Sequence, residues 1–298
     1  MKAQTLVLSI IIVNFNSCEY ITKCLESILK DTKEMETEII VVDNSSADNS
    51  VAVIRKLYPQ VLVIENPRNI GFAAANNIAI KKARGKYILV LNPDTIISTG
   101  TTIELLNFMT LHPEIGMLSP KLIRQDGSLD TACRRSFPTP FDIYFHLLGL
   151  DRLFPNSKLF AHYNLSYLNP SESCEVDCVA GAFMLVRSAA VNMVGLMDER
   201  FFMYVEDIDW AHRFRLQGWQ VYYYANREVL HYKHGSTNKE KNGMLPEFYK
   251  ALYQGYDKFY AQQTPTIFNW TMFFTLRIFL FFALISFRIR KYFMTISQ

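Results

Sequence analysis

The chain of 298 residues is long enough to bury a full hydrophobic core and to form one large domain or two small ones. Apolar residues make up 50% of the sequence and charged residues 20%, a balance that excludes a disordered protein. The formal net charge of +3 at pH 7 is too small to indicate nucleic-acid binding, and we expect no nucleic acid partner.

The first half of the sequence alternates strand and helix patterns. Four short apolar runs predict buried strands, at residues 6–13, 38–42, 61–64 and 86–91. Three segments between them predict helices, at residues 20–29, 50–58 and 72–83. Asn16 and Ser17 suit the cap of the first helix, and Asp48 suits that of the second. This alternation is typical of βαβ units, which predicts a mostly parallel sheet with right-handed crossovers.

The second half loses that regularity. A helix at 101–111 and a strand at 115–119 precede a stretch at 121–175 that is rich in proline, aromatic and loop residues. Beyond it we expect four elements: a broken strand at 176–186, a helix at 208–216, and strands at 220–224 and 228–232. We therefore predict an α/β domain with a nucleotide-binding half at 1–119, an irregular half at 120–240 and a tail at 241–298.

The strand predicted at 86–91 has an unusual end. Asn92 and Pro93 stop the apolar run, and Pro93 cannot donate a hydrogen bond to a strand ladder. Asp94 is thereby placed at the carboxyl end of a central strand, where open α/β sheets bind their ligands. A carboxylate there suits a divalent cation that holds a diphosphate, although Asp94 could also cap the following turn.

Polar residues follow each of the four predicted strands. The candidate binding residues among them are Asn14, Asn16, Asp43, Ser45, Arg68, Asn69, Gly71, Phe72, Asn92 and Asp94. In a parallel sheet these strand ends converge on one crevice. Asp43 can accept a hydrogen bond from a base or a ribose, and Gly71 begins a helix whose free N–H groups suit phosphate. Each cluster alone is also an ordinary turn or helix cap.

Three carboxylates, Glu206, Asp207 and Asp209, open the helix predicted at 208–216. Acidic residues are common in a first helical turn, and Asp209 can pair with Arg213 one turn later. A carboxylate in an aromatic loop can also be a general base, because partial burial raises its pKa toward neutrality. After the next strands, His231 or His234 could complete a metal site, although a histidine in such a place is usually structural.

Six ordered motifs between residues 6 and 236 resemble family 2 glycosyltransferases with the GT-A fold. They are SIIIVNFNS (9–17), VVDNSSADNS (41–50), NIGFAAANN (69–77), LVLNPDT (89–95), GAFMLVRS (181–188) and DERFFMYVEDIDWAHRFRLQGW (198–219). The GFAAANN and LNPD forms are most similar to rhamnosyltransferases that use dTDP-L-rhamnose.

The resemblance implies a role for each matching position. Asp43 is expected to contact the nucleoside, Asp94 to bind Mg²⁺ or Mn²⁺ on the diphosphate, and His231 to join the metal or diphosphate site. Asp207 is the expected catalytic base, with Glu206 beside it in the substrate site. The chain departs from the general motif at Asn92, where the family usually has an acid, so the cation site carries one negative charge fewer.

The implied reaction is inverting transfer of a sugar, most like L-rhamnose from dTDP-L-rhamnose, to a polyprenyl-diphosphate-linked or polysaccharide acceptor. Residues 134–169 are expected to form part of the acceptor side. Alternatives are a UDP-sugar donor, a nucleotidyltransferase, and a membrane scaffold that has lost catalysis. A nucleotidyltransferase would normally have a glycine-rich, basic loop after the first strand, which residues 14–17 do not provide.

The tail contains an apolar segment at 267–287, of which 16 residues in 21 are apolar. As a helix it would reach about 32 Å, enough to cross a bilayer. Arg277 at its centre costs ~3 kcal/mol on insertion scales, and spanning would carry the basic flank of Arg288, Arg290 and Lys291 to the far side. We therefore expect a peripheral or monotopic helix on the cytoplasmic face of the plasma membrane, with a buried helix in a homo-oligomer as the alternative.

The five cysteines are odd in number and lack the paired short spacings of a zinc site, so we expect reduced thiols in a cytosolic setting. Cys174 and Cys178 leave a disulfide or half a metal site as an alternative. Lys2 is the only charged residue before the first apolar run, which leads directly into polar residues at 14–16. We therefore expect no signal peptide.

Overall fold

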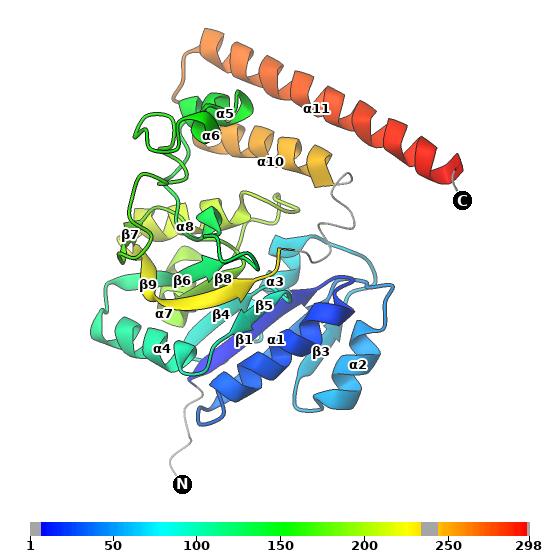
Figure 1. Ribbon diagram of the computed structural model, residues 1–298, viewed down its shortest axis with the longest axis vertical. Helices are drawn as coiled ribbons and strands as arrows, with labels where there is room; N and C mark the ends of the chain where they lie inside the picture. The colour runs from blue at the N-terminus through cyan, green and yellow to red at the C-terminus, as the bar shows by residue number, and fades with distance from the viewer. Residues whose placement is uncertain (1–6, 234–243, 297–298) are drawn as a thin grey trace.

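A nine-stranded mixed sheet forms the centre of the molecule (Figure 1). The computed structural model describes residues 7–233 and 244–296, so His234 lies outside the described residues. The strands are β1 (Leu8–Asn14), β2 (Thr37–Asp43), β3 (Leu62–Glu65), β4 (Tyr87–Leu91), β5 (Thr95–Ile97), β6 (Ile115–Ile123), β7 (Cys174–Val176), β8 (Phe183–Arg187) and β9 (Gln220–His231). Their order is β3-β2-β1-β4-β8-β6-β9-β5, and β7 also pairs with β9.

Helices cover both faces of this sheet, and further helices lie beyond them (Figure 1). The helices of the described residues are α1 (Cys18–Asp31), α2 (Ser50–Leu57), α3 (Phe72–Ile80), α4 (Thr101–Leu111), α5 (Pro140–Leu147), α6 (Leu150–Leu153), α7 (Ser188–Val194), α8 (Glu206–Leu216), α10 (Met244–Phe259) and α11 (Thr266–Ile296). Because crossovers are right-handed, the connections β1-α1-β2-α2-β3 put α1 and α2 on one face, and the return through α3 to β4 puts α3 on the other. The predicted α/β class is confirmed.

Burial explains why β1 and β4 lie at the centre of the parallel part. Every residue of both strands is buried, including the polar Ser9 and Asn14 of β1, whereas the edge strand β3 is partly exposed. The strands β1, β2, β3 and β4 pair in parallel, and β8 then runs antiparallel to β4. The carboxyl ends of β1, β2 and β4 therefore meet at one edge, as predicted.

Several boundaries in the second half were predicted wrongly. β6 continues through Pro120 to Ile123, beyond the predicted end at 119. Its pairing with β8 covers only Met117 and Leu118, so Pro120 need not donate an N–H to that strand. The strands expected at 220–224 and 228–232 are one strand, β9, with a register irregularity opposite Pro120. The short strand β5 was not predicted, and it pairs with the end of β9.

Helices also occur where the sequence analysis predicted an irregular segment. α5 begins with a capping box in which Thr139 and Asp142 exchange hydrogen bonds, with Pro140 in the first turn. That local pattern was present in the sequence and was missed. α7 and α10 were likewise not predicted as separate helices, and α11 is longer than the segment 267–287.

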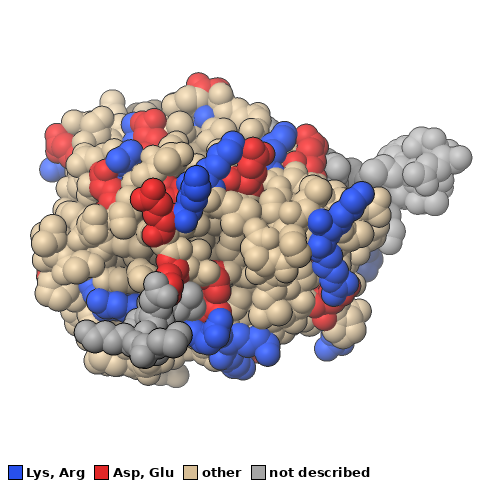
Figure 2. Space-filling view, turned by 90° about the horizontal axis from the view of Figure 1, so that it is seen from below, with Lys and Arg blue, Asp and Glu red and all other residues tan. Residues whose placement is uncertain are grey.

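α10 and α11 form a layer beyond α8, away from the sheet (Figure 1). Tyr256 of α10 packs in a small buried cluster with Met272 and Leu276 of α11 and Ile143 of α5. The opposite end of the molecule has a different character, since Lys and Arg are interspersed with Asp and Glu on the face seen from below (Figure 2). The face opposite α11 is thus an ordinary solvated surface.

Candidate active site

Asn14 and Asp43 end the neighbouring strands β1 and β2, and the parallel register places them opposite each other. Asn14 Nδ2 donates to Asp43 Oδ1 at 2.8 Å, and Ser46 donates to the same carboxylate through Oγ at 2.6 Å and N–H at 2.9 Å. Asn14 Oδ1 is buried without a hydrogen-bond partner among the described residues. Because an unpaired buried acceptor is costly, this oxygen marks a place where a polar ligand group can bind.

Asn16 and Ser45 lie in the loops that leave β1 and β2. Both have left-handed backbone conformations, with φ of 50° and 67°, which are uncommon for residues other than glycine. The Asn16 N–H donates to Ser46 Oγ at 2.9 Å, and Asn16 Oδ1 accepts from the Ala47 N–H at 2.8 Å. These hydrogen bonds fasten the two loops together beside the Asn14–Asp43 pair.

Asn44 holds the loop after β3 against the end of β2. Its Oδ1 accepts from the Ile70 N–H at 3.1 Å, and its Nδ2 donates to Asn69 Oδ1 at 2.7 Å. Asn69 Oδ1 also accepts the Gly71 N–H at 3.0 Å. The loop is therefore rigidly attached to the sheet edge, with Arg68 exposed on it.

At the helix start that was expected to suit phosphate, two N–H groups, those of Gly71 and Phe72, are engaged within the protein. The first donates to Asn69, and the second donates to the carbonyl of Phe202 at 2.7 Å. Gly71 has φ +89°, and a Cβ there would lie 2.5 Å from the Phe202 oxygen, so only glycine fits. The absence of a side chain at Gly71 therefore lets the start of α3 contact the loop that leads into α8.

Asp94 and His231 are brought together by the pairing of β5 with β9. Thr95, next to Asp94, lies opposite His231, and Asp94 Oδ1 is 3.4 Å from His231 Nε2. Both side chains are buried. A carboxylate and an imidazole that face each other can hold a divalent cation, the role expected of these residues.

Asp130 is a further residue of this cluster that the sequence analysis missed. Its Oδ2 is 2.8 Å from His231 Nδ1, and its Oδ1 accepts from Lys233 Nζ at 2.7 Å. Burial alone would lower the pKa of His231, but its hydrogen bonds to Asp130 and Asp94 raise it to about 9. Burial would raise the pKa of Asp130, but His231 and Lys233 hold it well below its usual range. Asp130 thus fixes the ring so that Nε2 points to Asp94.

The turn at 180–182 connects this cluster to the acidic end of α8. The Asn92 N–H donates to the carbonyl of Ala182 at 3.0 Å, which ties the Asn92-Pro93-Asp94 turn to the start of β8. The Gly181 N–H donates to Asp207 Oδ2 at 3.1 Å. Asn92, two residues before the predicted cation residue Asp94, and the predicted base Asp207 therefore contact the same short turn.

Asp207 is held by an arginine that the sequence analysis did not identify. Arg135 Nη2 donates to Asp207 Oδ2 at 2.7 Å, and Arg135 Nη1 donates to the hydroxyl of Tyr163 at 2.9 Å. Asp207 Oδ1 accepts from the N–H of Ile208 at 2.8 Å. A carboxylate has about four acceptor positions, so the three recorded bonds leave room for one more donor.

Glu206 is buried next to Asp207, and its Oε2 has no hydrogen-bond partner among the described residues. Burial and the negative charge of Asp207 raise the pKa of Glu206. The two neighbouring carboxyl groups thus differ in environment. Asp207 faces donors and an arginine, whereas Glu206 is favoured in its neutral form.

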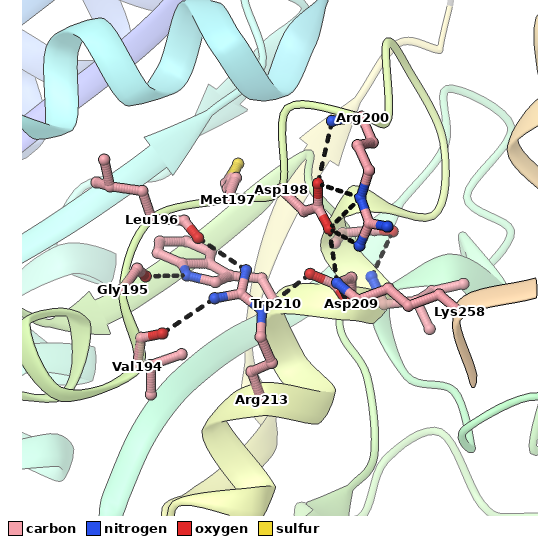
Figure 3. A network of polar contacts seen from close by, with 12 residues as sticks. Val194, Gly195, Leu196, Met197, Asp198, Arg200, Asp209, Trp210, Arg213 and Lys258 are labelled. Atoms are coloured by element: carbon pink, nitrogen blue, oxygen red, sulfur yellow. Dashed lines mark hydrogen bonds and ion pairs between the residues drawn. The ribbon is translucent and has the colours of Figure 1, made fainter. Parts of the chain in front are cut away.

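Asp209 has a structural environment (Figure 3). It is fully buried, accepts from Arg213 Nε at 2.9 Å, and also pairs with Lys258 of α10. Lys258 Nζ donates in addition to Asp198 Oδ2 at 2.7 Å. This network attaches α10 to α8 and to the loop before it, and the predicted Asp209–Arg213 pair is confirmed.

Comparisons with known proteins indicate the family and the fold of the chain. The profile of "Glycosyl transferase family 2" matches residues 9–186. An N-acetylglucosaminyl-diphospho-decaprenol L-rhamnosyltransferase of Mycobacterium tuberculosis is 29% identical over 261 residues, which cover 84% of this chain and 84% of the relative. Rhamnosyltransferase WbbL of Escherichia coli is 28% identical over 237 residues, which cover 76% of this chain and 83% of the relative.

Solved glycosyltransferase structures share the fold. S. aureus TarS (residues 1–349) superposes with a TM-score of 0.55 at 18% identity, over 83% of this chain and 64% of that one. GalNAc-T7, solved with UDP, GalNAc and Mn²⁺, gives a TM-score of 0.57 at 18% identity, over 78% of this chain and 44% of that one. This chain therefore spans less than two thirds of the length of these structures.

We expect Asp209→Asn to act on stability. Removing the charge leaves Arg213 without its acidic partner and Lys258 with Asp198 alone. The free energy of unfolding should fall by about 3 kcal/mol, near the lower end for broken buried pairs, because both cations are partly exposed. Urea unfolding measures this loss. Glu26→Gln, which breaks the exposed pair with Lys30, is the matched control and should change stability little. Equal effects of the two substitutions would contradict the assignment.

Proposed function

The chain belongs to glycosyl transferase family 2, and from that premise we propose that it transfers L-rhamnose from dTDP-L-rhamnose, with inversion, to a polyprenyl-diphosphate-linked or polysaccharide acceptor. The observation that carries the proposal is the arrangement around the turn at 180–182. The N–H of Asn92, two residues before Asp94, donates to the Ala182 carbonyl of this turn, and the Gly181 N–H donates to Asp207. His231 lies beside Asp94. The two rhamnosyltransferases similar to this chain support the choice of sugar.

In this proposal Asp207 takes the proton of the acceptor hydroxyl. The hydroxyl oxygen forms a bond to the anomeric carbon while the bond from that carbon to the diphosphate oxygen breaks on the opposite face. General-base assistance of this kind contributes ~10²–10⁴-fold to the rate. Arg135 and the Gly181 N–H hold the carboxylate in place, so little reorganisation is needed when the proton is transferred.

Asp94 and His231 have the donor atoms to hold Mg²⁺ or Mn²⁺. Among the described residues no group of three or more His, Cys, Asp or Glu side chains is arranged as a metal site, so the remaining ligands would come from the diphosphate and water. When bound, the ion neutralises charge that develops on the leaving diphosphate. GalNAc-T7, whose fold is similar, was solved with Mn²⁺, which supports this proposal.

Asp43 and Asn14 are the proposed contacts of the nucleoside. The unpaired Oδ1 of Asn14 can accept a hydrogen bond from a base or ribose, and Asp43 lies beside it. These contacts suit thymidine and uridine alike, so a UDP-sugar donor is the alternative. TarS, whose fold is similar, was solved with UDP-GlcNAc, which supports that alternative.

The acceptor side and the membrane are linked through α11. The segment Thr266–Ser286 is long and apolar enough to cross a membrane by length and composition. Met272, Leu276 and Ala283 are buried, whereas apolar residues on the other face are exposed: Ile267, Trp270, Phe274, Ile278 and Phe281. Arg277 reaches the ring of Tyr253 in α10 at 5.9 Å. We propose that α11 lies in the plane of the cytoplasmic leaflet, consistent with a relative named for a decaprenol-linked substrate.

Asp207→Asn should lower turnover by at least ~10²-fold and leave donor binding nearly intact, because the base acts only in the transition state. Steady-state kinetics and donor calorimetry measure the two effects. Glu206→Gln is the control, since it keeps the shape of the neutral acid. Near-normal turnover of Asp207→Asn would remove this residue from the role and point to Glu206 or Asp209.

Asp94→Ala should abolish the dependence of donor affinity on Mg²⁺ or Mn²⁺, and His231→Ala should weaken it less. Asp130→Asn keeps both ligands but loses the fixed ring, so metal affinity should fall about 10–100-fold. Calorimetry with dTDP-rhamnose, with metal and with chelator, measures each variant. If the unaltered protein bound dTDP-rhamnose equally well with metal and with chelator, the proposed cation site would be wrong. Arg68 would then be the residue that binds the diphosphate.

The donor is tested by competition among dTDP-rhamnose, UDP-glucose and UDP-galactose. We expect dTDP-rhamnose to bind most tightly. We also expect it to be the only one of the three that is hydrolysed, slowly, when no acceptor is present. A clear preference for either UDP-sugar would replace rhamnose as the proposed donor, without affecting the family assignment.

The placement of α11 is tested with Gln298→Cys in intact cells. An in-plane helix keeps this cysteine inside, so an impermeant thiol reagent should label it only after the cells are opened. Labelling from outside would mean that the segment spans the membrane. A detergent-free soluble oligomer would instead support a helix buried between copies of the chain.

A further inference from the structure

A cavity of about 440 Å³ opens between α5 and the segment that follows α6. This volume is within the range of small-ligand pockets. Its apolar wall includes Phe141 and Phe145 from α5 and Leu159 from the opposite segment. Phe141 and Leu159 are about three-fifths exposed, at 59% and 62%. We call it the α5 cavity.

The charged residues of the α5 cavity leave one cation available. Asp142 Oδ2 is occupied, because it accepts from the Thr139 N–H at 2.7 Å and lies 3.0 Å from His162 Nδ1. Lys158 is exposed at the cavity and has no ion-pair partner recorded among the described residues. An anionic group that entered here would therefore meet Lys158 beside an aromatic wall.

The chain on both sides of the α5 cavity leads to residues near the proposed base. Thr139, in its wall, is four residues after Arg135, which places the two Cα atoms at most about 14 Å apart. His162, in the opposite wall, precedes Tyr163, whose hydroxyl accepts from Arg135. Both walls thus continue along the chain to Arg135, which holds Asp207, and to Tyr163, which contacts Arg135.

The wall formed by α5 meets α11. The ring of Phe268, in the first turn of α11, lies 5.9 Å from that of Phe141 and 6.1 Å from that of Tyr144. Figure 1 shows α5 and α6 beside α10 and the start of α11. The exposed apolar face of α11 therefore begins where the α5 cavity ends.

We propose that the α5 cavity binds the lipid part of a prenyl-diphosphate-linked acceptor. Lys158 faces the diphosphate, and Phe141, Phe145 and Leu159 contact the first isoprenoid units, whose continuation follows α11 toward the membrane. The inference rests on the proposed transfer to a lipid-linked acceptor and names the place that recognises the lipid. It gives a common role to an apolar cavity, its exposed cation and the apolar helix that contacts its wall.

Photo-crosslinking of the full chain tests the site directly. The probe is farnesyl diphosphate with a benzophenone on its terminal isoprene unit, mapped by mass spectrometry. We expect labelled peptides within residues 139–162, and competition by farnesyl diphosphate but not by farnesol or inorganic diphosphate alone. Labelling confined to residues 266–286 would overturn the proposal. Equal competition by farnesol would also overturn it, because it would indicate apolar binding that does not recognise the diphosphate.

Lys158→Glu and Leu159→Ser change exposed residues and should leave folding intact. Each should raise KM for a prenyl-diphosphate-linked acceptor about tenfold, the loss expected for one charged or apolar contact. KM for the same sugar on a short soluble aglycone, and the rate of donor hydrolysis, should not change. Leu111→Ser on α4, which is also exposed, is the matched control.

The outcomes separate this inference from the proposed function. Equal effects on both acceptors, or none on either, would overturn the α5 cavity as the lipid site while donor hydrolysis still reports a working transferase. Absence of hydrolysis in the unaltered protein with every nucleotide sugar tested would remove the proposed function, and this inference with it.

Discussion

The candidate site depends on the turn at 180–182, held between a strand end and a helix start. Its Ala182 carbonyl accepts from Asn92 and its Gly181 N–H donates to Asp207, so the cation side and the base side cannot shift independently. A Cβ at Gly181 would lie 3.3 Å from the ring of Phe72, tighter than an ordinary contact. The antiparallel pairing of β8 with the central strand β4 fixes this turn, because strand register leaves little freedom.

Three largely buried carboxylates near that turn have an oppositely charged neighbour from a distant part of the chain. Asp130 holds His231, Arg135 holds Asp207, and Lys258 pairs with Asp209. A buried charge without such a partner would cost several kcal/mol, so these pairs keep the elements in a defined arrangement. The Lys258 pair extends this constraint to α10, and through α10 to the helix that we propose lies at the membrane.

The sequence predicted the features that depend on local order. Proline ends β4 before Asp94, and the acidic run at 206–209 opens α8, because both follow from hydrogen bonding within a few residues. The contacts of Asp130 and Arg135 could not be predicted, since their partners lie 101 and 72 residues away and the segment that carries them has no periodicity. The only indication in the sequence was the pair of adjacent arginines at 134 and 135, which the structure shows to be buried. The hydrogen bond from the Phe72 N–H to Phe202 likewise depends on a distant loop.

The central claim is that base and leaving group act on opposite faces of the sugar, from the two sides of one turn. Its most direct test is the anomeric configuration of the product, followed by NMR from the first turnovers with the preferred donor. The account predicts that the new glycosidic bond has the configuration opposite to that of the nucleotide sugar, with no covalent sugar–protein adduct. Retention of configuration would contradict it, because Asp207 would then have to act as a nucleophile or have no part in the reaction.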